Sequence, residues 1–100
     1  MNPYLECTRP NFWLSCMLID ENSKVKPMDI INMLNDANVE ARPIWKPMHL
    51  QPVFKKNDFI SVTDKSVGEK IFEHGICLPS DIKMTEAEQN IVIDLIKNMF

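Results

Sequence analysis

The chain has 100 residues, of which 45% are hydrophobic and 25% charged, and only two are glycines; this composition is typical of one globular domain with a modest core. The net charge of −3 comes from interspersed signs, which excludes the basic stripe that nucleic-acid binding requires. No apolar run is long enough to cross a bilayer and no signal-peptide pattern is present, so we expect a cytoplasmic protein without nucleic acid or membrane as partners.

The first predicted element is a strand over residues 12–19, an almost unbroken apolar run that is typical of a central strand buried on both faces. Pro27 suits the first position of a helix, and residues 28–37 then carry apolar side chains at helical spacing. Asn38 is a suitable C-terminal cap for this helix, and residues 39–42 form a short extended segment that the next proline stops. Strand, helix and strand in this order predict a right-handed β-α-β crossover.

Residues 40–52 form the most distinctive segment of the chain. Three prolines fix its backbone and remove three donors, which excludes both an interior helix and a central strand. A pre-ordered loop of this kind suits ligand binding, because less conformational entropy is lost on association. The alternative is a polar surface loop, which the large apolar side chains among the charges disfavour. We take as candidate binding residues Arg42, Trp45, Lys46, Met48, His49 and Gln51.

These side chains differ in what they can bind. Arg42 suits a phosphate or carboxylate through its planar fork, and Lys46 suits the same groups as a point charge. His49 can donate or accept a hydrogen bond near neutral pH. Trp45 offers a flat apolar surface on the same loop.

The second half of the chain predicts a solvated turn followed by two helices and a strand-like segment. Ser66 and Glu69 form a capping box at the start of a helix over residues 67–74, which Gly75 would end. Residues 76–78 then form a short buried segment. A second capping box precedes the last helix, whose apolar stripe we expect in the core: Ile91, Val92, Leu95, Ile96, Met99 and Phe100.

The other titratable side chains favour structural roles. His74 in the last turn of its helix, and Glu86 and Glu88 in a first turn, complement the helix dipole. The three cysteines, at widely separated positions, fit neither a disulfide framework nor a zinc site, so we expect reduced thiols with Cys16 in the core. We therefore assign no catalytic residue and no metal ligand.

Three segments carry a resemblance to a known family: residues 11–16 (NFWLSC), 39–52 (VEARPIWKPMHLQP) and 72–80 (FEHGICLPS). In this order they resemble the C-terminal part of sugar aminotransferases of the DegT/DnrJ/EryC1/StrS family, and the likeness runs from about residue 11 to residue 100. The middle segment looks most like members that aminate UDP-linked 4-keto-6-deoxy sugars for bacillosamine-type sugars, pilin glycosylation or exopolysaccharide.

The resemblance implies an α+β fold with about three strands and three helices, like the C-terminal domain of a fold-type I aminotransferase. Residues 1–100 would be that single small domain of a dimeric enzyme. The large domain, which holds pyridoxal phosphate through a Schiff-base lysine, is absent, and no lysine of this sequence stands in the family's context for that role. The resemblance therefore implies that the chain binds no cofactor alone and is inactive alone, while residues 40–52 border the nucleotide-sugar cleft.

Two hypotheses follow from these observations. The first is a fragment, the small domain of a nucleotide-sugar aminotransferase without its catalytic domain. The second is a stand-alone module that binds a sugar nucleotide or another protein. In either case no large domain would cover the face that carries Trp13 and Trp45, so we expect the chain to self-associate through this face.

Overall fold

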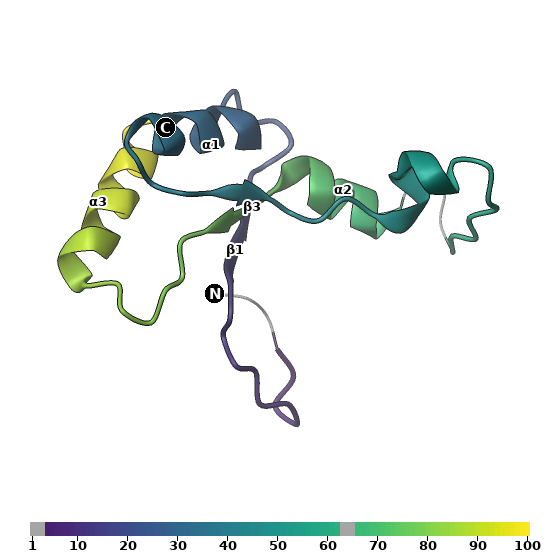
Figure 1. The fold of residues 1–100 in the computed structure, drawn as a ribbon, viewed down its shortest axis with the longest axis horizontal. Coiled ribbons are helices and arrows are strands. Elements are labelled where there is room, and N and C mark those ends of the chain that lie inside the picture. The colour runs from purple at the N-terminus through teal and green to yellow at the C-terminus, as the bar shows by residue number, and fades with distance from the viewer. Residues whose placement is uncertain (1–3, 63–65) are drawn as a thin grey trace.

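The computed structural model describes residues 4–62 and 66–100, and Figure 1 shows the path of the chain. Its strands are β1 (Ser15–Leu18), β2 (Arg42–Pro43) and β3 (Gly75–Leu78), and its α-helices are α1 (Pro27–Asp36), α2 (Val67–His74) and α3 (Glu86–Lys97). Two short 3-10 helices, η1 (Met48–Leu50) and η2 (Pro52–Phe54), follow β2. The predicted α+β class is confirmed.

The three strands form one sheet in the order β1-β3-β2. Because β3 is antiparallel to both neighbours, β1 and β2 run parallel to each other on its two sides, and α1 connects them. This is the predicted β-α-β order, with the last strand inserted between the first two. The predicted extended segment over residues 39–42 is wrong in extent, because β2 is Arg42–Pro43 and includes the proline that was expected to stop it. The register pairs Cys77 with Cys16 on one side and with Arg42 on the other.

The predicted central strand over residues 12–19 is wrong in extent and position. β1 spans Ser15–Leu18 and lies at the sheet edge, where Leu18 is 62% exposed. Phe12 has a φ of 52°, in the left-handed region, so the strand conformation cannot continue through it. The central strand is β3, the segment that the sequence indicated only as short and buried.

Helix α1 begins at Pro27, as predicted, and ends in a Schellman motif. Asn38 follows the cap residue with a φ of 58°, and its N–H donates to the Asn35 carbonyl oxygen. The N–H of Val39 donates to the Leu34 carbonyl oxygen, which closes the motif. Asn tolerates this left-handed backbone better than most residues, which explains why the helix stops here.

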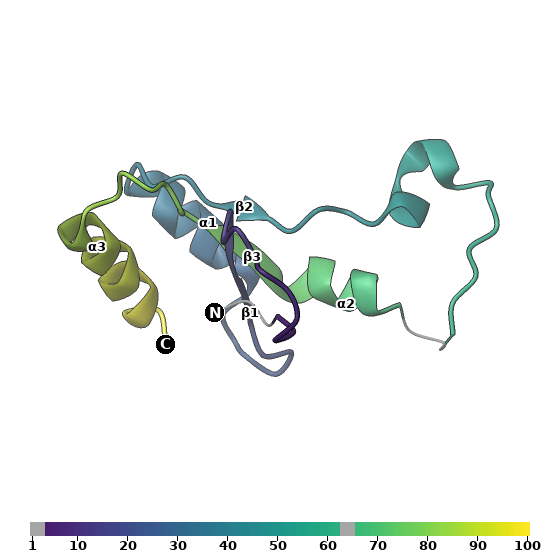
Figure 2. The same cartoon turned by 90° about the horizontal axis from the view of Figure 1, so that it is seen from below.

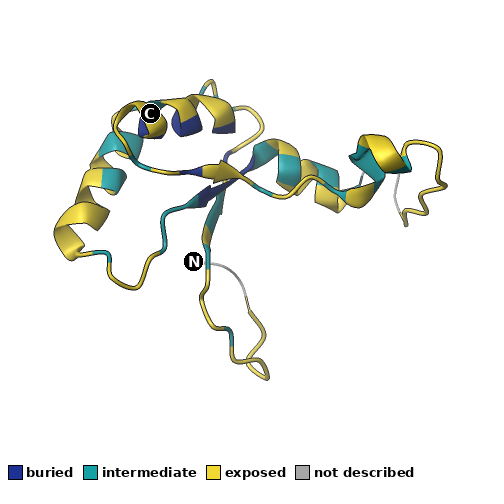
Figure 3. Ribbon diagram, viewed as in Figure 1, coloured by how far each residue is buried: buried dark blue, intermediate teal, exposed yellow. Residues whose placement is uncertain are grey.

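The core lies between α1 and the sheet, with α3 against its side (Figure 3). Ile30 and Leu34 of α1 and Ile76 of β3 are fully buried. The predicted apolar stripe of α3 is only partly in this core. Four of its members pack against it, while Ile91 and Phe100 remain more than half exposed.

Gly75 ends α2, but not through the left-handed conformation expected of a terminal glycine. Its φ of −98° and ψ of 152° are extended, and the chain passes directly from α2 into β3. The glycine is needed for space, because an added Cβ would overlap the Cγ1 atom of Ile44 and the carbonyl oxygen of Ile71.

Residues 44–62, here called the arm, project from the sheet and return toward the start of α2 (Figures 1 and 2). The arm explains why the radius of gyration is 15.8 Å, above the ~13 Å typical of a domain of this length. Among the described residues no helix has the length and apolarity needed to span a membrane.

Candidate functional site

An open cavity of about 840 Å³ lies between the segment before β1, the start of the arm, the loop after β3 and the first turns of α3. Its apolar wall includes Trp13, Trp45 and Leu78, and its charged groups include Arg42 and Lys83 as well as carboxylates. A concave surface with aromatic walls and a few charged groups is what small-molecule sites commonly offer. It is the leading candidate for a binding site in the described part of the chain.

The two tryptophans are the most prominent feature of this cavity. The ring centroids of Trp13 and Trp45 are 6.2 Å apart, with the ring planes inclined by 41°. They are 69% and 64% exposed, so each ring has a face available for a ligand. The hydroxyl of Ser80 donates to the Trp13 carbonyl oxygen at 3.0 Å and thereby ties the Trp13 segment to the loop after β3.

The charges around the cavity have both signs. The Arg42 Nε atom donates to the Glu40 carboxylate at 2.7 Å, and both side chains are largely exposed. Lys83 also lines the cavity, as do Asp81 and Glu88. An anionic ligand would therefore have to displace the Glu40 carboxylate from Arg42. Because both side chains are exposed, breaking this ion pair costs little free energy.

The carboxylate of Glu88 takes part in the N-terminal cap of helix α3. It accepts hydrogen bonds from the backbone N–H and the hydroxyl of Thr85, both at 2.8 Å. These two bonds, the backbone one first, lower the pKa of Glu88. The predicted capping box of α3 is confirmed, and the structural role assigned to Glu88 fits this geometry.

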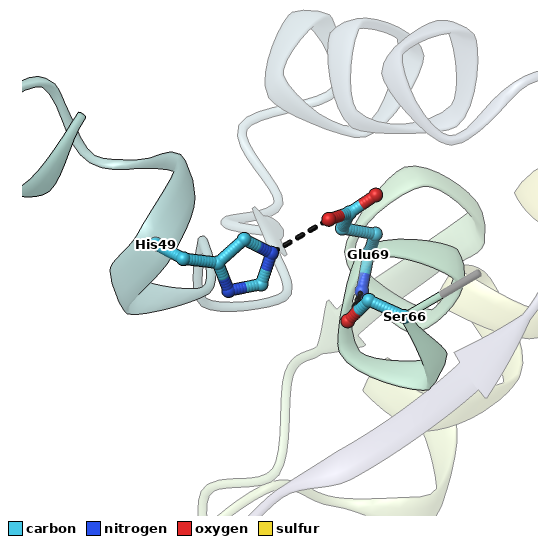
Figure 4. A network of polar contacts seen from close by, with 3 residues as sticks. All are labelled: His49, Ser66 and Glu69. Atoms are coloured by element: carbon cyan, nitrogen blue, oxygen red, sulfur yellow. Dashed lines mark hydrogen bonds and ion pairs between the residues drawn. The ribbon is translucent and has the colours of Figure 1, made fainter. Parts of the chain in front are cut away.

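His49 lies away from the cavity, on the arm. Its Nε2 atom is 2.6 Å from the Glu69 Oε1 atom, and Figure 4 shows this contact between η1 and α2. Its ring also stacks on Phe59, with centroids 3.6 Å apart and planes inclined by 16°. The Glu69 backbone N–H donates to the Ser66 hydroxyl at 3.3 Å, so Ser66 caps the helix as predicted. The predicted capping box is not completed, because the Glu69 carboxylate binds His49 instead.

Three other predicted site residues, Lys46, Met48 and Gln51, also lie outside the cavity. Lys46 and Met48 are exposed on the arm. Gln51 turns back on its own segment, where its amide Nε2 donates to the Lys46 carbonyl oxygen at 3.4 Å. Only Arg42 and Trp45 of the six predicted residues line the cavity.

Sequence reasoning missed the groups that the loop after β3 brings to the cavity. Ser80 and Lys83 lie far along the chain from the arm, and only the position of β3 between β1 and β2 places them near Trp13 and Trp45. The sequence does indicate an exposed position for Trp13, as a large aromatic residue on the face expected to lack a covering domain. Among the described residues no group of three or more His, Cys, Asp or Glu side chains could hold a metal ion.

The positions of the Cys16 and Cys77 thiols differ from the prediction. Cys16 is half-buried at the sheet edge and not in the core, because β1 is an edge strand. The buried thiol is that of Cys77 on the central strand, and its Sγ atom is 3.6 Å from that of Cys16. Burial, followed by the neighbouring Cys16 thiol, raises the pKa of Cys77 to about 11.

A family of known proteins matches most of the chain. The model of the DegT/DnrJ/EryC1/StrS aminotransferase family matches residues 3–97. The chain is 45% identical over 91 residues to the Bacillus subtilis (strain 168) protein named "Putative pyridoxal phosphate-dependent aminotransferase EpsN", a match that covers 90% of this chain and 23% of that protein.

Two GDP-perosamine synthases are more distant relatives. That of Caulobacter vibrioides is 27% identical over 92 residues, covering 91% of this chain, and that of Vibrio cholerae is 23% identical over 90 residues, covering 90%. Each match covers 24% of the relative. The chain thus spans about a quarter of the length of the curated relatives it matches.

Proposed function

Since this chain belongs to the DegT/DnrJ/EryC1/StrS aminotransferase family, we propose that it forms the small C-terminal domain of a pyridoxal phosphate-dependent nucleotide-sugar aminotransferase. The observation that carries the proposal is the family match over residues 3–97. The α+β fold and the 45% identity to EpsN across most of the chain support it.

The proposed substrate is a UDP-linked 4-keto-6-deoxy sugar, aminated for pilin or protein glycosylation or for a polysaccharide. Its support is the amino-acid sequence of residues 42–52, which resembles that of family members acting on such sugars. The perosamine synthases are named for a GDP-linked sugar, so a comparison of UDP- and GDP-linked sugars tests which nucleotide is bound.

The cavity offers a wall for such a substrate. The faces of Trp13 and Trp45 could stack on a nucleobase, a contact that is worth about 1 to 3 kcal/mol per base in single-stranded nucleic-acid complexes. Arg42 could turn from Glu40 to a diphosphate, for which its planar fork is suited. In this proposal the contact between His49 and Glu69 holds the arm in place. Lys46, Met48 and Gln51 lie on the arm outside the cavity, and we propose that they contact a part of the substrate that extends beyond it.

The described residues do not fit pyridoxal phosphate. This cofactor supplies the electron sink for transamination and is bound as a Schiff base to a lysine in an enclosed site. Every lysine in the described ranges, residues 4–62 and 66–100, is exposed. We therefore assign no catalytic residue here, and we propose that the 100-residue chain alone does not catalyse transamination.

A chimera tests the proposed place in the enzyme. The 91-residue segment of EpsN that matches this chain would be replaced by the corresponding residues here, and amination of UDP- and GDP-linked keto sugars would be compared with intact EpsN. We expect activity with the UDP sugar, and a loss of about tenfold or more with Arg42→Ala. A folded chimera that binds pyridoxal phosphate but is inactive where EpsN is active would refute the proposal.

The paired tryptophans also favour a second candidate, a stand-alone module that binds a sugar nucleotide. Calorimetric titration of the 100-residue chain with UDP and GDP sugars tests it, with Arg42→Ala, Trp45→Ala and His49→Ala as variants. Saturable binding that Trp45→Ala removes would support the module, and no measurable heat in the parent chain would remove it.

We further propose that the chain self-associates through the face of Trp13 and Trp45. Both rings are mostly exposed, and large exposed apolar patches commonly mark interaction surfaces. Sedimentation of the parent chain and of Trp45→Ala at rising concentration tests this. A strictly monomeric parent chain at high concentration would count against it.

A further inference from the structure

Cys16 and Cys77 face each other across neighbouring strands. The register of β1 and β3 pairs them directly, with Ser15 opposite Leu78 and Met17 opposite Ile76 on either side. Their Sγ atoms are 3.6 Å apart, although the two residues are 61 positions apart in the chain. This juxtaposition plays no part in the proposed aminotransferase role.

The backbone geometry at this pair suits a covalent link. Directly opposed residues of antiparallel strands have Cα atoms about 4.5 to 5.5 Å apart, within the range of about 4.4 to 6.8 Å that disulfides span. The sulfur atoms would have to approach from 3.6 Å to about 2.05 Å, which rotation of the two side chains can supply without separating the strands.

We propose that Cys16 and Cys77 form a dithiol modification site that reacts with a low-molecular-weight disulfide to give an intramolecular disulfide between β1 and β3. The natural reagent class is a glutathione-like disulfide, which acts as the oxidant. The two cysteines lose two electrons and two protons in total, and the reagent is reduced to two thiols.

The two sulfurs have different parts in this exchange. Cys16 is half-buried, and its thiolate attacks one sulfur of the reagent, forming a mixed disulfide and releasing the first small thiol. Cys77 is 7% exposed, so the reagent cannot easily reach it directly. Once Cys77 has lost its proton to water, its sulfur attacks the Cys16 sulfur and releases the second small thiol.

The order of attack also agrees with the pKa of Cys77. Burial and the adjacent Cys16 thiol raise the pKa of Cys77 to about 11, which keeps Cys77 protonated at neutral pH and disfavours it as the first nucleophile. The new bond would fasten the edge strand β1 to the central strand β3.

Intact mass measurement tests the proposal. The 100-residue chain carrying Cys7→Ser, which removes the exposed third thiol, would be incubated in its native state with glutathione disulfide. We expect the loss of two hydrogen atoms with no retained glutathione, and a Cys16–Cys77 cross-linked peptide after digestion. The thermal midpoint should rise by about 10 °C and return on reduction.

Two further variants separate the steps. In the Cys7→Ser background, Cys77→Ser should retain one glutathione on Cys16, because nothing displaces it, and Cys16→Ser should stay largely unmodified. A native chain that keeps glutathione on Cys16 without closing the bond would overturn the proposal. So would a chain that forms the bond only in denaturant.

Discussion

The Nε2 atom of His49 lies 2.6 Å from the Glu69 Oε1 atom and joins η1 to the first turn of α2. The His49 side chain is 17% exposed and that of Glu69 37%, so the contact is partly shielded from water. The stacking of His49 on Phe59 adds a second attachment within the arm. His49 therefore anchors the arm, a structural task that its place in a polar loop did not indicate.

We predict that Glu69→Ala loosens the arm. The variant removes the acceptor of the His49 contact, which should lower the free energy of unfolding by about 1 kcal/mol. Trypsin should also cut faster at the exposed Lys55 and Lys56. Glu73→Ala is the matched control, because it removes an exposed carboxylate from the same helix. Equal cleavage rates in the two variants would contradict the anchoring role.

We predict opposite effects from alanine at the two glycines. A Cβ at position 75 would overlap Ile44 and the Ile71 carbonyl oxygen, so Gly75→Ala should destabilise the chain by about 1 to 3 kcal/mol. A Cβ at position 68 would lie 3.5 Å from the Pro47 Cγ atom, an ordinary contact, so Gly68→Ala in helix α2 should stabilise it by about 0.5 to 1 kcal/mol. Urea unfolding measures both. Equal changes would mean that Gly75 is not needed for space.

The local signals in the sequence predicted the helices well. Pro27 and Thr85 mark the starts of α1 and α3, and Ser66 caps α2, because each acts through its own neighbouring backbone. Strand order was not predictable in the same way. An apolar run indicates burial but not position in the sheet, so the sequence favours the longer run around β1 for the central place that β3 occupies.

The candidate site was predicted only in part, for a related reason. Residues 40–52 are continuous in sequence, but the chain leaves the sheet after Pro43. Arg42 and Trp45 therefore line the cavity, whereas His49 lies farther along the arm and contacts α2. The partners of the cavity residues come from the loop after β3. Such contacts depend on tertiary packing, which local spacing does not report.

We predict that the hydroxyl of Thr85 stabilises α3. Thr85→Ala should cost about 0.5 to 2 kcal/mol, whereas Thr85→Ser, which keeps the oxygen that accepts from the Glu88 N–H, should cost much less. Thermal unfolding followed by circular dichroism would measure both. A serine variant as unstable as the alanine variant would exclude the capping explanation.

We predict that the same cap weakens in acid. The pKa of Glu88 is lowered in the folded state, so its contribution is present above the ordinary value of 4.5 and is lost as the pH falls through the lowered folded value. Helix content of the parent chain and of Glu88→Gln should therefore converge as the pH decreases below 4.5. A constant difference at every pH would contradict this assignment.

We predict, finally, an alkaline loss of stability that depends on Cys77. Its pKa is about 11 in the folded chain against an ordinary 9.0, because burial and the adjacent Cys16 thiol disfavour the thiolate. Between these values the unfolded chain releases the proton while the folded chain keeps it, so the stabilisation present below pH 9 declines toward pH 11. The difference between these two pKa values corresponds to about 2 to 3 kcal/mol at most.

Urea unfolding under reducing conditions would measure this decline at steps between pH 8 and 11. Other groups also titrate in this range, so the informative quantity is the difference between the parent chain and Cys77→Ala. Cys7→Ala is the control, because Cys7 is exposed, and it should keep the full decline. If Cys77→Ala declines as steeply as Cys7→Ala, then the alkaline loss comes from other groups and the buried thiol does not set it, since only a group that binds protons differently in the two states can make stability depend on pH.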